Sequence, residues 1–253
     1  MSFELLILFF FLVAVLYSMV GFGGGSSYIA LLILFNTSHT EAPVLALTCN
    51  LLVVTGGAWH FWRAKNINKN LLFPFLITSI PMAYFGGLTV VNKETFQGIL
   101  ALCLLGAALR MLLYRSNKEP VEDSITNPPL KISLIVGSLL GYVSGLVGIG
   151  GGIFLAPILY TLHWGRPKQI ASTATFFILL NSIAGILGQV QKAEISLSVL
   201  QDYWPLLLAV LLGGQVGSLM INFKLRSRNV EFLTALLILV VSVKILGNLM
   251  LSL

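Results

Sequence analysis

Long apolar stretches alternate with short polar loops along the chain, and the same order of stretches occurs twice. Runs of roughly 20 apolar residues are long enough to cross the hydrocarbon core of a bilayer as a helix, and they lack the alternation typical of barrel strands. The pattern therefore predicts an all-α polytopic membrane protein. The expected segments are 3–20, 26–35, 44–62, 71–91 and 96–114, then 132–147, 153–163, 170–190, 203–221 and 232–251.

The second stretch of each half is too short to span a membrane comfortably. As a helix, residues 26–35 would rise only ~15 Å, about half of the ~30 Å hydrocarbon core. We therefore expect half-helices at 26–35 and 153–163 that run from the membrane interior to one surface. The pattern leaves open whether the longer segment before each of them spans fully or re-enters the membrane in a hairpin.

A glycine cluster precedes each short stretch: Gly21-Phe22-Gly23-Gly24-Gly25 and, 127 positions later, Gly148-Ile149-Gly150-Gly151-Gly152. Glycine disfavours a helix because it loses the most backbone entropy on ordering. In lipid, broken backbone is tolerated only where protein or a water-filled cavity satisfies its polar groups. Two equivalent breaks, one in each half, indicate a transport site between internal repeats. Close helix packing through small residues is the alternative.

The halves are expected to form two membrane repeats, 1–114 and 132–253, joined by a polar linker at 115–131. If each glycine cluster reverses the chain, each half has an odd number of segments and the repeats have inverted topology. If each half crosses four times, the repeats are parallel. Further landmarks that match at a common offset of 131 are Phe73-Pro74 with Trp204-Pro205, and Gly86 with Gly217.

Loop charge favours the inverted arrangement. Cytoplasmic loops are enriched in Lys and Arg, and inversion places all four basic groups of this chain on one side, with both termini on the non-cytoplasmic side. Parallel repeats would divide the groups between the two sides. We therefore expect a multi-pass protein of a bacterial inner (plasma) membrane. The groups are Arg63, Lys65 and Lys69; Arg115, Lys118 and Lys131; Arg166 and Lys168; and Lys224, Arg226 and Arg228.

Composition agrees with a membrane protein and excludes a soluble one. Hydrophobic residues make up 57% of the chain and charged residues 9%, whereas soluble domains carry roughly 25% charged residues. The net charge of +6 is explained by loop orientation, so no nucleic-acid partner is expected. No cofactor, metal site or disulfide framework is expected, because Cys49 and Cys103 both lie in apolar segments.

The half-helices that follow the glycine clusters would point their N-terminal amides into the protein, where they suit a small anion. The candidate substrate-binding residues are Gly23, Gly24, Gly25, Ser26 and Ser27 in the first half, and Gly150, Gly151 and Gly152 in the second. The next helix of each half adds polar groups that fall at matched positions, Thr48 and Asn50 opposite Thr173 and Thr175. Each such group alone could instead join helices.

Two cations lie within the last stretch of each half, Arg110 and Lys244. A cation that faces a cavity would attract an anion, while snorkelling towards an interface is the alternative, especially for Arg110 near the end of its segment. No carboxylate lies within the central segments, so a carboxylate relay for proton coupling is not expected.

The glycine motifs resemble those of the sulfite exporter TauE/SafE family. The resemblance rests on Gly21-Phe22-Gly23-Gly24-Gly25-Ser26, on residues 145–152, and on Ala156-Pro157 and Ala171-Ser172-Thr173 after them. Size, duplicated halves and central linker fit as well. The resemblance implies transport of small sulfur-containing anions such as sulfite, sulfoacetate and other sulfonates, in the direction of export.

The expected function is therefore secondary transport of a sulfur oxyanion, by alternating access of two inverted halves around a midplane site. An anion channel would need a continuous polar lining, which the scattered hydroxyls do not supply. A membrane enzyme would need a nucleophile, base or metal cluster. A non-transporting membrane assembly protein stays open, because it could keep the glycines for packing alone.

Overall fold

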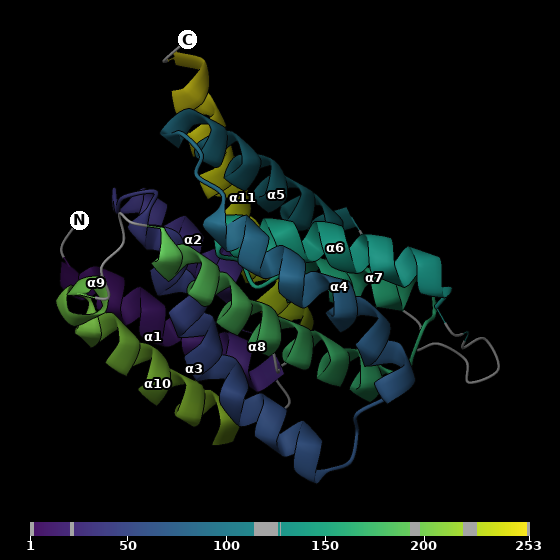
Figure 1. Ribbon diagram of the computed structural model, residues 1–253. Helices are drawn as coiled ribbons and strands as arrows, with labels where there is room; N and C mark the ends of the chain where they lie inside the picture. Colours follow the sequence, from purple (N-terminus) through teal and green to yellow (C-terminus); the bar gives the residue numbers. More distant parts are fainter. Residues whose placement is uncertain are drawn as a thin grey trace.

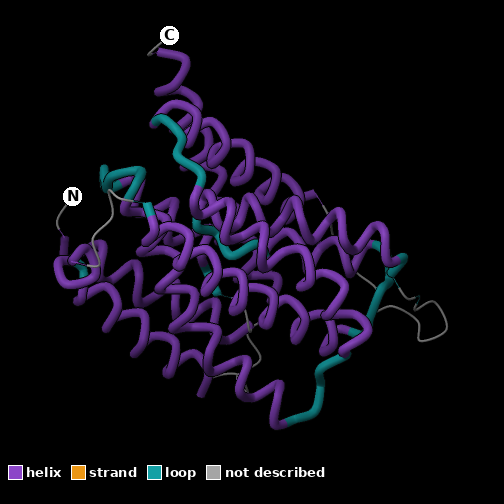
Figure 2. Tube along the Cα trace, in the orientation of Figure 1, coloured by secondary structure: helices purple, strands orange, loops and turns teal. Residues whose placement is uncertain are grey.

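The chain is a bundle of α-helices in a computed structural model, which describes residues 3–20, 23–113, 126, 128–192, 198–219 and 227–251 (Figure 1). Over those ranges Figure 2 shows helices and loops only, which confirms the predicted all-α class. The helices are α1 Phe3–Val20, α2 Gly25–Leu34, α3 Glu41–Arg63, α4 Lys69–Leu88, α5 Lys93–Leu113, α6 Leu130–Val147, α7 Gly152–Thr161, α8 Pro167–Gln191, α9 Ser198–Asp202, α10 Trp204–Leu219 and α11 Ser227–Leu251.

Each expected apolar segment corresponds to one of these helices, within a few residues at the ends. The five-residue α9 is an addition that the apolar pattern does not predict. Several predicted features lie outside the described residues: the start of the first glycine cluster at 21–22, most of the linker, and the basic side chains of the last group.

Four of the described helices, α3, α4, α6 and α8, are long and apolar enough to cross a membrane. Large apolar side chains also face outwards, among them Leu102, Leu139 and Leu187, which are 58–65% exposed. An apolar outer surface of this kind is compatible with lipid and not with water. The chain is therefore an integral membrane protein.

Among the helix pairs that pack so closely that glycine is required at the contact are α4–α6 and α1–α10. On α6, a Cβ at Gly137 would lie 2.5 Å from the Phe75 carbonyl oxygen of α4, and Gly141 and Gly145 make equivalent contacts with Ser79 and Ala83. The α1–α10 pair is built in the same way. A Cβ at Gly213 would lie 2.6 Å from the Phe11 carbonyl oxygen, and one at Gly217 would lie 2.9 Å from Ser18 Cβ. Small residues thus hold both pairs together at backbone distance.

The α3 and α8 helices cross at the centre of the bundle and run antiparallel. Gly57, late in α3, faces Thr175, early in α8, with 3.6 Å between a Cβ built on the glycine and the threonine methyl. Leu47, early in α3, contacts Gly185, late in α8. Around this crossing the packing is reciprocal: α4 lies against α6 and α8, while α10 lies against α1 and α3.

The second glycine cluster folds the chain back on itself. The Thr126 N–H, just before α6, donates to the His163 carbonyl oxygen just after α7, at 3.1 Å. The end of α7 therefore lies beside the chain that leads into α6, and α6 and α7 form a helical hairpin. The hairpin places the N-terminus of α7 inside the protein and its C-terminus at one end of the bundle.

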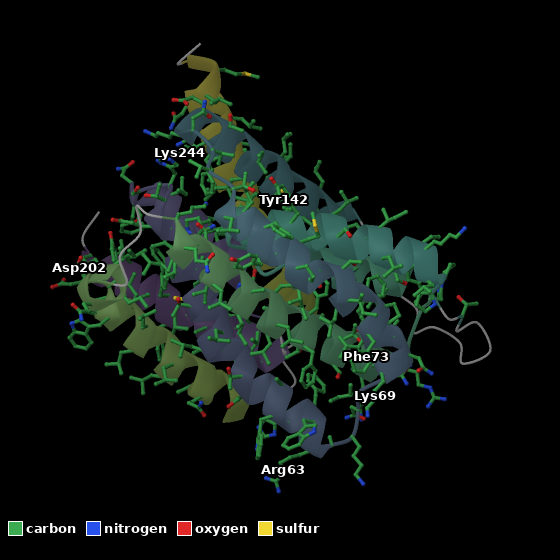
Figure 3. The ribbon with its side chains drawn as sticks, in the orientation of Figure 1. Arg63, Lys69, Phe73, Tyr142, Asp202 and Lys244 are labelled. Carbon is green, nitrogen blue, oxygen red and sulfur yellow. The ribbon has the colours of Figure 1, made fainter. Side chains whose placement is uncertain are left out.

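Charged residues mark the ends of the bundle. Figure 3 shows Arg63 at the bottom centre and Lys69 at the lower right, both at one end of the bundle, and Asp202 at the opposite end, on the left. The beginning of α1 and the end of α11 lie on the upper left side of Figure 1, away from the α3–α4 loop that follows Arg63. The helices therefore separate a basic end from the end where the described chain begins and finishes.

Candidate functional site

The first half-helix, α2, begins inside the protein at a glycine with left-handed backbone. Gly24, which precedes the helix, has φ +80°, a conformation that side-chain-bearing residues rarely adopt. A Cβ there would lie 3.2 Å from ring atoms of both Tyr17 and Tyr28. Gly25 to Leu32 are all buried. The first N–H groups of α2, which have no intrahelical acceptor, therefore lie in the interior of the bundle.

The second half-helix, α7, begins in the same way. Gly151 precedes it with φ +76°, and Gly148, which ends α6, has φ +87°. A Cβ at Gly151 would lie 2.8 Å from the Phe177 ring and 3.4 Å from Ser144 Cβ. The left-handed glycines thus turn the chain sharply between α6 and α7, and they leave no room for a side chain.

Asn50 of α3 joins the two glycine clusters. It is fully buried, and its Nδ2 donates to the Ile149 carbonyl oxygen of the second cluster at 3.0 Å. A Cβ at Gly23 would lie 2.5 Å from Asn50 Oδ1, and one at Gly150 would lie 2.7 Å from Asn50 Nδ2. A Cβ at Gly25 would overlap both Asn50 Nδ2 and the Ile149 carbonyl oxygen. The clusters, 127 positions apart in sequence, therefore meet around one amide.

The Asn50 amide is only half satisfied. Its Oδ1 is buried and accepts no hydrogen bond from the described part of the chain. An unpaired buried polar atom is costly, so native proteins keep few of them, and they often mark a binding or strained site. Beside two half-helix N-termini, such an atom indicates a place prepared for a polar ligand.

Around the first cluster the surroundings are polar. Ser26 and Ser27 are 2% and 1% exposed, and the Ser27 hydroxyl shares a hydrogen bond of 3.0 Å with the Tyr17 hydroxyl. Both serines lie in the first turn of α2, as expected from the sequence. The Tyr28 hydroxyl is also buried, and it has no partner within the described ranges.

Around the second cluster, apart from Asn50 beside Gly150 and Ser144 beside Gly151, the surroundings are apolar. A Cβ at Gly150 would lie 3.0 Å from Ile178 Cγ2, and one at Gly152 would overlap the end of the same isoleucine. The Phe177 ring covers Gly151. Ile178 therefore lies beside Gly150 and Gly152 of the second cluster only, whereas Asn50 lies beside both clusters.

The predicted threonines do not share the position of Asn50. Thr48 is half-buried and donates to the Val44 carbonyl oxygen of its own helix at 2.8 Å. Thr175 is buried and donates to the Ala171 carbonyl oxygen at 2.8 Å, with its methyl towards α3. Thr173 is buried, and its hydroxyl has no partner among the residues that the structure describes. Of the four, only Asn50 is shown against the glycine clusters.

Neither predicted cation is placed at the clusters. Arg110 of α5 donates through Nη2 to the Pro157 carbonyl oxygen at 3.2 Å and to the Thr161 hydroxyl, at the C-terminal end of α7. A cation there suits the negative end of the helix dipole. Lys244 is exposed on α11, at the upper left of Figure 3. A role for either residue in attracting an anion stays a prediction.

Comparison with known proteins places the chain in a family. A profile of the family described as Sulfite exporter TauE/SafE matches residues 6–245, nearly the whole chain. This chain belongs to the TauE/SafE family. The resemblance seen in its glycine motifs is therefore confirmed.

Relatives of this TauE/SafE chain carry matching names. The "Probable membrane transporter protein y4hK" of Sinorhizobium fredii is 32% identical over 239 residues, which cover 94% of this chain and 95% of the relative. The "Probable membrane transporter protein YunE" of Bacillus subtilis is 21% identical over 276 residues, 97% and 98% of the two chains. No solved structure gives a significant match. Family and relatives indicate a membrane transporter.

Four residues that contact the glycine clusters of this TauE/SafE member were not predicted from the sequence. Tyr17 and Ser144 lie in the helices before the clusters, seven positions ahead of Gly24 and Gly151 respectively. That equal spacing is a signal that could have found them. The apolar partners Phe177 and Ile178 give no such signal, because they are indistinguishable by type from ordinary packing residues.

Proposed function

We propose that this chain is a secondary transporter that exports a small sulfur oxyanion, such as sulfite, sulfoacetate or another sulfonate. The observation that carries the proposal is the meeting of two half-helix N-termini at Asn50. Each N-terminus contributes unpaired N–H donors and about half a positive charge, which together favour an anion over a cation. The sulfur preference and the direction of export come from the family description.

The inverted arrangement of repeats 1–114 and 132–253 belongs to the proposal. It is supported by equivalent helices that run in opposite directions. α3 and α8, each the helix after a half-helix, are antiparallel at their crossing. α5 and α11, the last helix of each half, pack together with Gly98 at the start of one near Leu249 at the end of the other. Repeats related by an axis in the membrane plane require such opposition.

Access to the site requires movement, because Asn50 is fully buried and closed to solvent in this structure. The close glycine contacts hold α1–α10 and α4–α6 together as pairs; α8 is joined as closely to α4, and α3 lies against α8 and α10. We propose that the two pairs rock around the α3–α8 crossing and open the glycine clusters to each side in turn. Export needs no coupling ion, since one negative charge gains ~2.3 kcal/mol per 100 mV on leaving a negatively charged interior.

Flux of labelled sulfite, sulfoacetate and taurine in proteoliposomes tests the proposal. Leucine at Gly24 or Gly151 combines a strained positive φ with overlap of an aromatic ring, so both variants should lose transport of whichever anion the wild type carries. Gly247→Leu is the matched control, because a Cβ there meets no atom within 4 Å. Normal flux in both cluster variants would refute the glycine site. Single-channel currents would indicate a channel instead.

Membrane sidedness is tested with single cysteines at Asn68 and Asn229. Asn68 caps α4 beside the basic α3–α4 loop, and Asn229 is near the start of α11. The inverted arrangement places both on the cytoplasmic side, so an impermeant thiol reagent should label neither in intact cells and both in inside-out vesicles. A Cys49→Ser, Cys103→Ser background removes the native thiols. Labelling from opposite faces would overturn the inverted topology.

A further inference from the structure

The two atoms of the Asn50 amide face different sides of the site. Nδ2 lies towards Gly25, Ile149 and Gly150, whereas Oδ1 lies towards Gly23. The orientation is fixed by chemistry, because a rotated amide would set Oδ1 against the Ile149 carbonyl oxygen, and two acceptors repel. The acceptor is therefore the atom left over at the first cluster.

An acceptor at this place conflicts with an anion that has only acceptors. The half-helix N–H groups can bind the oxygens of any oxyanion, but Oδ1 would face one of those oxygens without a hydrogen between them. Burial makes the conflict costly, since Asn50 is 0% exposed and Oδ1 accepts from no described residue. A ligand that brings its own N–H or O–H group removes the conflict.

We infer that the anion carried at this site has a hydrogen-bond donor, which Asn50 Oδ1 accepts. The inference rests on the proposed function and narrows its substrate class. It favours hydrogensulfite over fully deprotonated sulfite, and a hydroxy- or amino-substituted sulfonate over a plain alkanesulfonate. Asn50 is then a specificity-determining residue. The backbone N–H groups of the half-helices bind the negative charge, and Oδ1 accepts a hydrogen bond from the N–H or O–H group of the ligand.

Asn50 alone would set the preference for a ligand with a hydrogen-bond donor, because the side chain beside the second cluster supplies no corresponding acceptor. That side chain, Ile178, is apolar. The nearest amide on α8 is Asn181, whose Nδ2 is bound to the Phe177 carbonyl oxygen of its own helix at 2.8 Å. Asn181 is also fully buried with an Oδ1 that lacks a partner in the described chain. It is therefore a matched control for loss of a buried amide.

The test compares two anions of equal charge, 2-hydroxyethanesulfonate and ethanesulfonate, in proteoliposomes with the full-length protein. The wild type should carry the hydroxylated anion on the order of tenfold or more faster at low concentration, because a site built for a hydroxyl rejects the analogue that lacks it. Asn50→Leu should bring this ratio to about one. Asn181→Leu should keep the wild-type ratio, whatever its effect on the rate.

Each outcome separates the inference from the proposed function. Equal transport of both anions by the wild type would overturn the inference and leave anion transport standing. A preference that survives in Asn50→Leu would assign the donor to another residue and equally overturn it. If neither sulfonate is carried, the pH dependence of sulfite flux tests the inference. Wild-type flux should rise with the hydrogensulfite fraction as the pH falls. Flux that instead follows the fraction of the sulfite dianion would refute the inference. Absence of flux for every anion would refute the proposed function itself.

Discussion

The α2 and α7 half-helices have the same length and the same left-handed glycine before them, yet they lie in different surroundings. α2 is enclosed from Gly25 to Leu32, and its first turn contacts Asn50, while the Ser27–Tyr17 hydrogen bond ties it to α1. α7 is only partly enclosed, and its first turn contacts Ile178. Two half-helices with the same backbone start therefore lie among different side chains.

The difference in surroundings indicates that the two glycine clusters have different roles. Under the proposed function, the first cluster contributes the polar contacts that distinguish one anion from another. The second contributes an apolar wall, with its own N–H donors but without a side-chain acceptor in the contacts around Gly150 and Gly152. Recognition would then depend mainly on the first half, although both halves form the cradle.

The largest expected effect is on the transport rate. It distinguishes the two clusters through variants that each add one methyl group. Gly25→Ala should reduce transport about 100-fold, because its Cβ overlaps Asn50 and the rigid Ile149 carbonyl. Gly152→Ala should cost less than about tenfold, since its Cβ meets the flexible end of Ile178. Flux in proteoliposomes measures both, with Gly56→Ala as a control that meets no atom within 4 Å. Equal losses would show that the clusters are equivalent.

Stability should also distinguish Asn50 from Ile178. Asn50→Leu leaves the buried Ile149 carbonyl without its Nδ2 donor and should lower the free energy of unfolding by about 1–3 kcal/mol. Ile178→Val removes one methyl group and should cost about 1 kcal/mol or less. Thermal unfolding in detergent gives the comparison. A larger loss in Ile178→Val would mean that apolar packing, not the amide, joins the clusters.

A smaller contrast concerns the hydroxyls ahead of each cluster. Tyr17→Phe removes the partner of the Ser27 hydroxyl and should cost about 1 kcal/mol. Ser144→Ala removes a buried oxygen that has no partner in the described ranges, so it should be neutral or slightly stabilising. The same unfolding measurement tests both. If Ser144→Ala is the more harmful, the second cluster holds a polar contact that the apolar description omits.

The smallest effects are expected at the predicted cations. Lys244→Gln should change the free energy of unfolding by less than about 0.5 kcal/mol and leave transport unchanged, because the side chain is exposed on α11. Arg110→Gln should cost about 0.5–1 kcal/mol by weakening the C-terminal end of α7. A large loss of anion affinity in Lys244→Gln, measured as a raised KM, would restore that residue to the transport path.

The helices were predictable from sequence because a continuous apolar run of helical length has few other solutions in lipid. The glycine clusters were predictable as interior half-helix starts for the same reason. Their meeting at Asn50 was not, because contacts between segments about 100 positions apart depend on how helices cross. Matching by sequence position set Asn50 opposite Thr175, whereas the contacts bring it, with Ile178, to Gly150. Thr48, two positions from Asn50, satisfies its hydroxyl within its own helix.

The reciprocal packing of α4 and α10 has a consequence for how the protein is made. α4, from the first half, makes its close glycine contacts with α6 and α8 of the second half, and α1 makes its own with α10. Because the chain is synthesised from its N-terminus, α1 and α4 enter the membrane before the helices that pack against them have been made. Assembly must finish late, after most of the chain has been inserted, and a chain that ends before α6 would leave the faces of α1 and α4 that pack against the second half exposed to lipid.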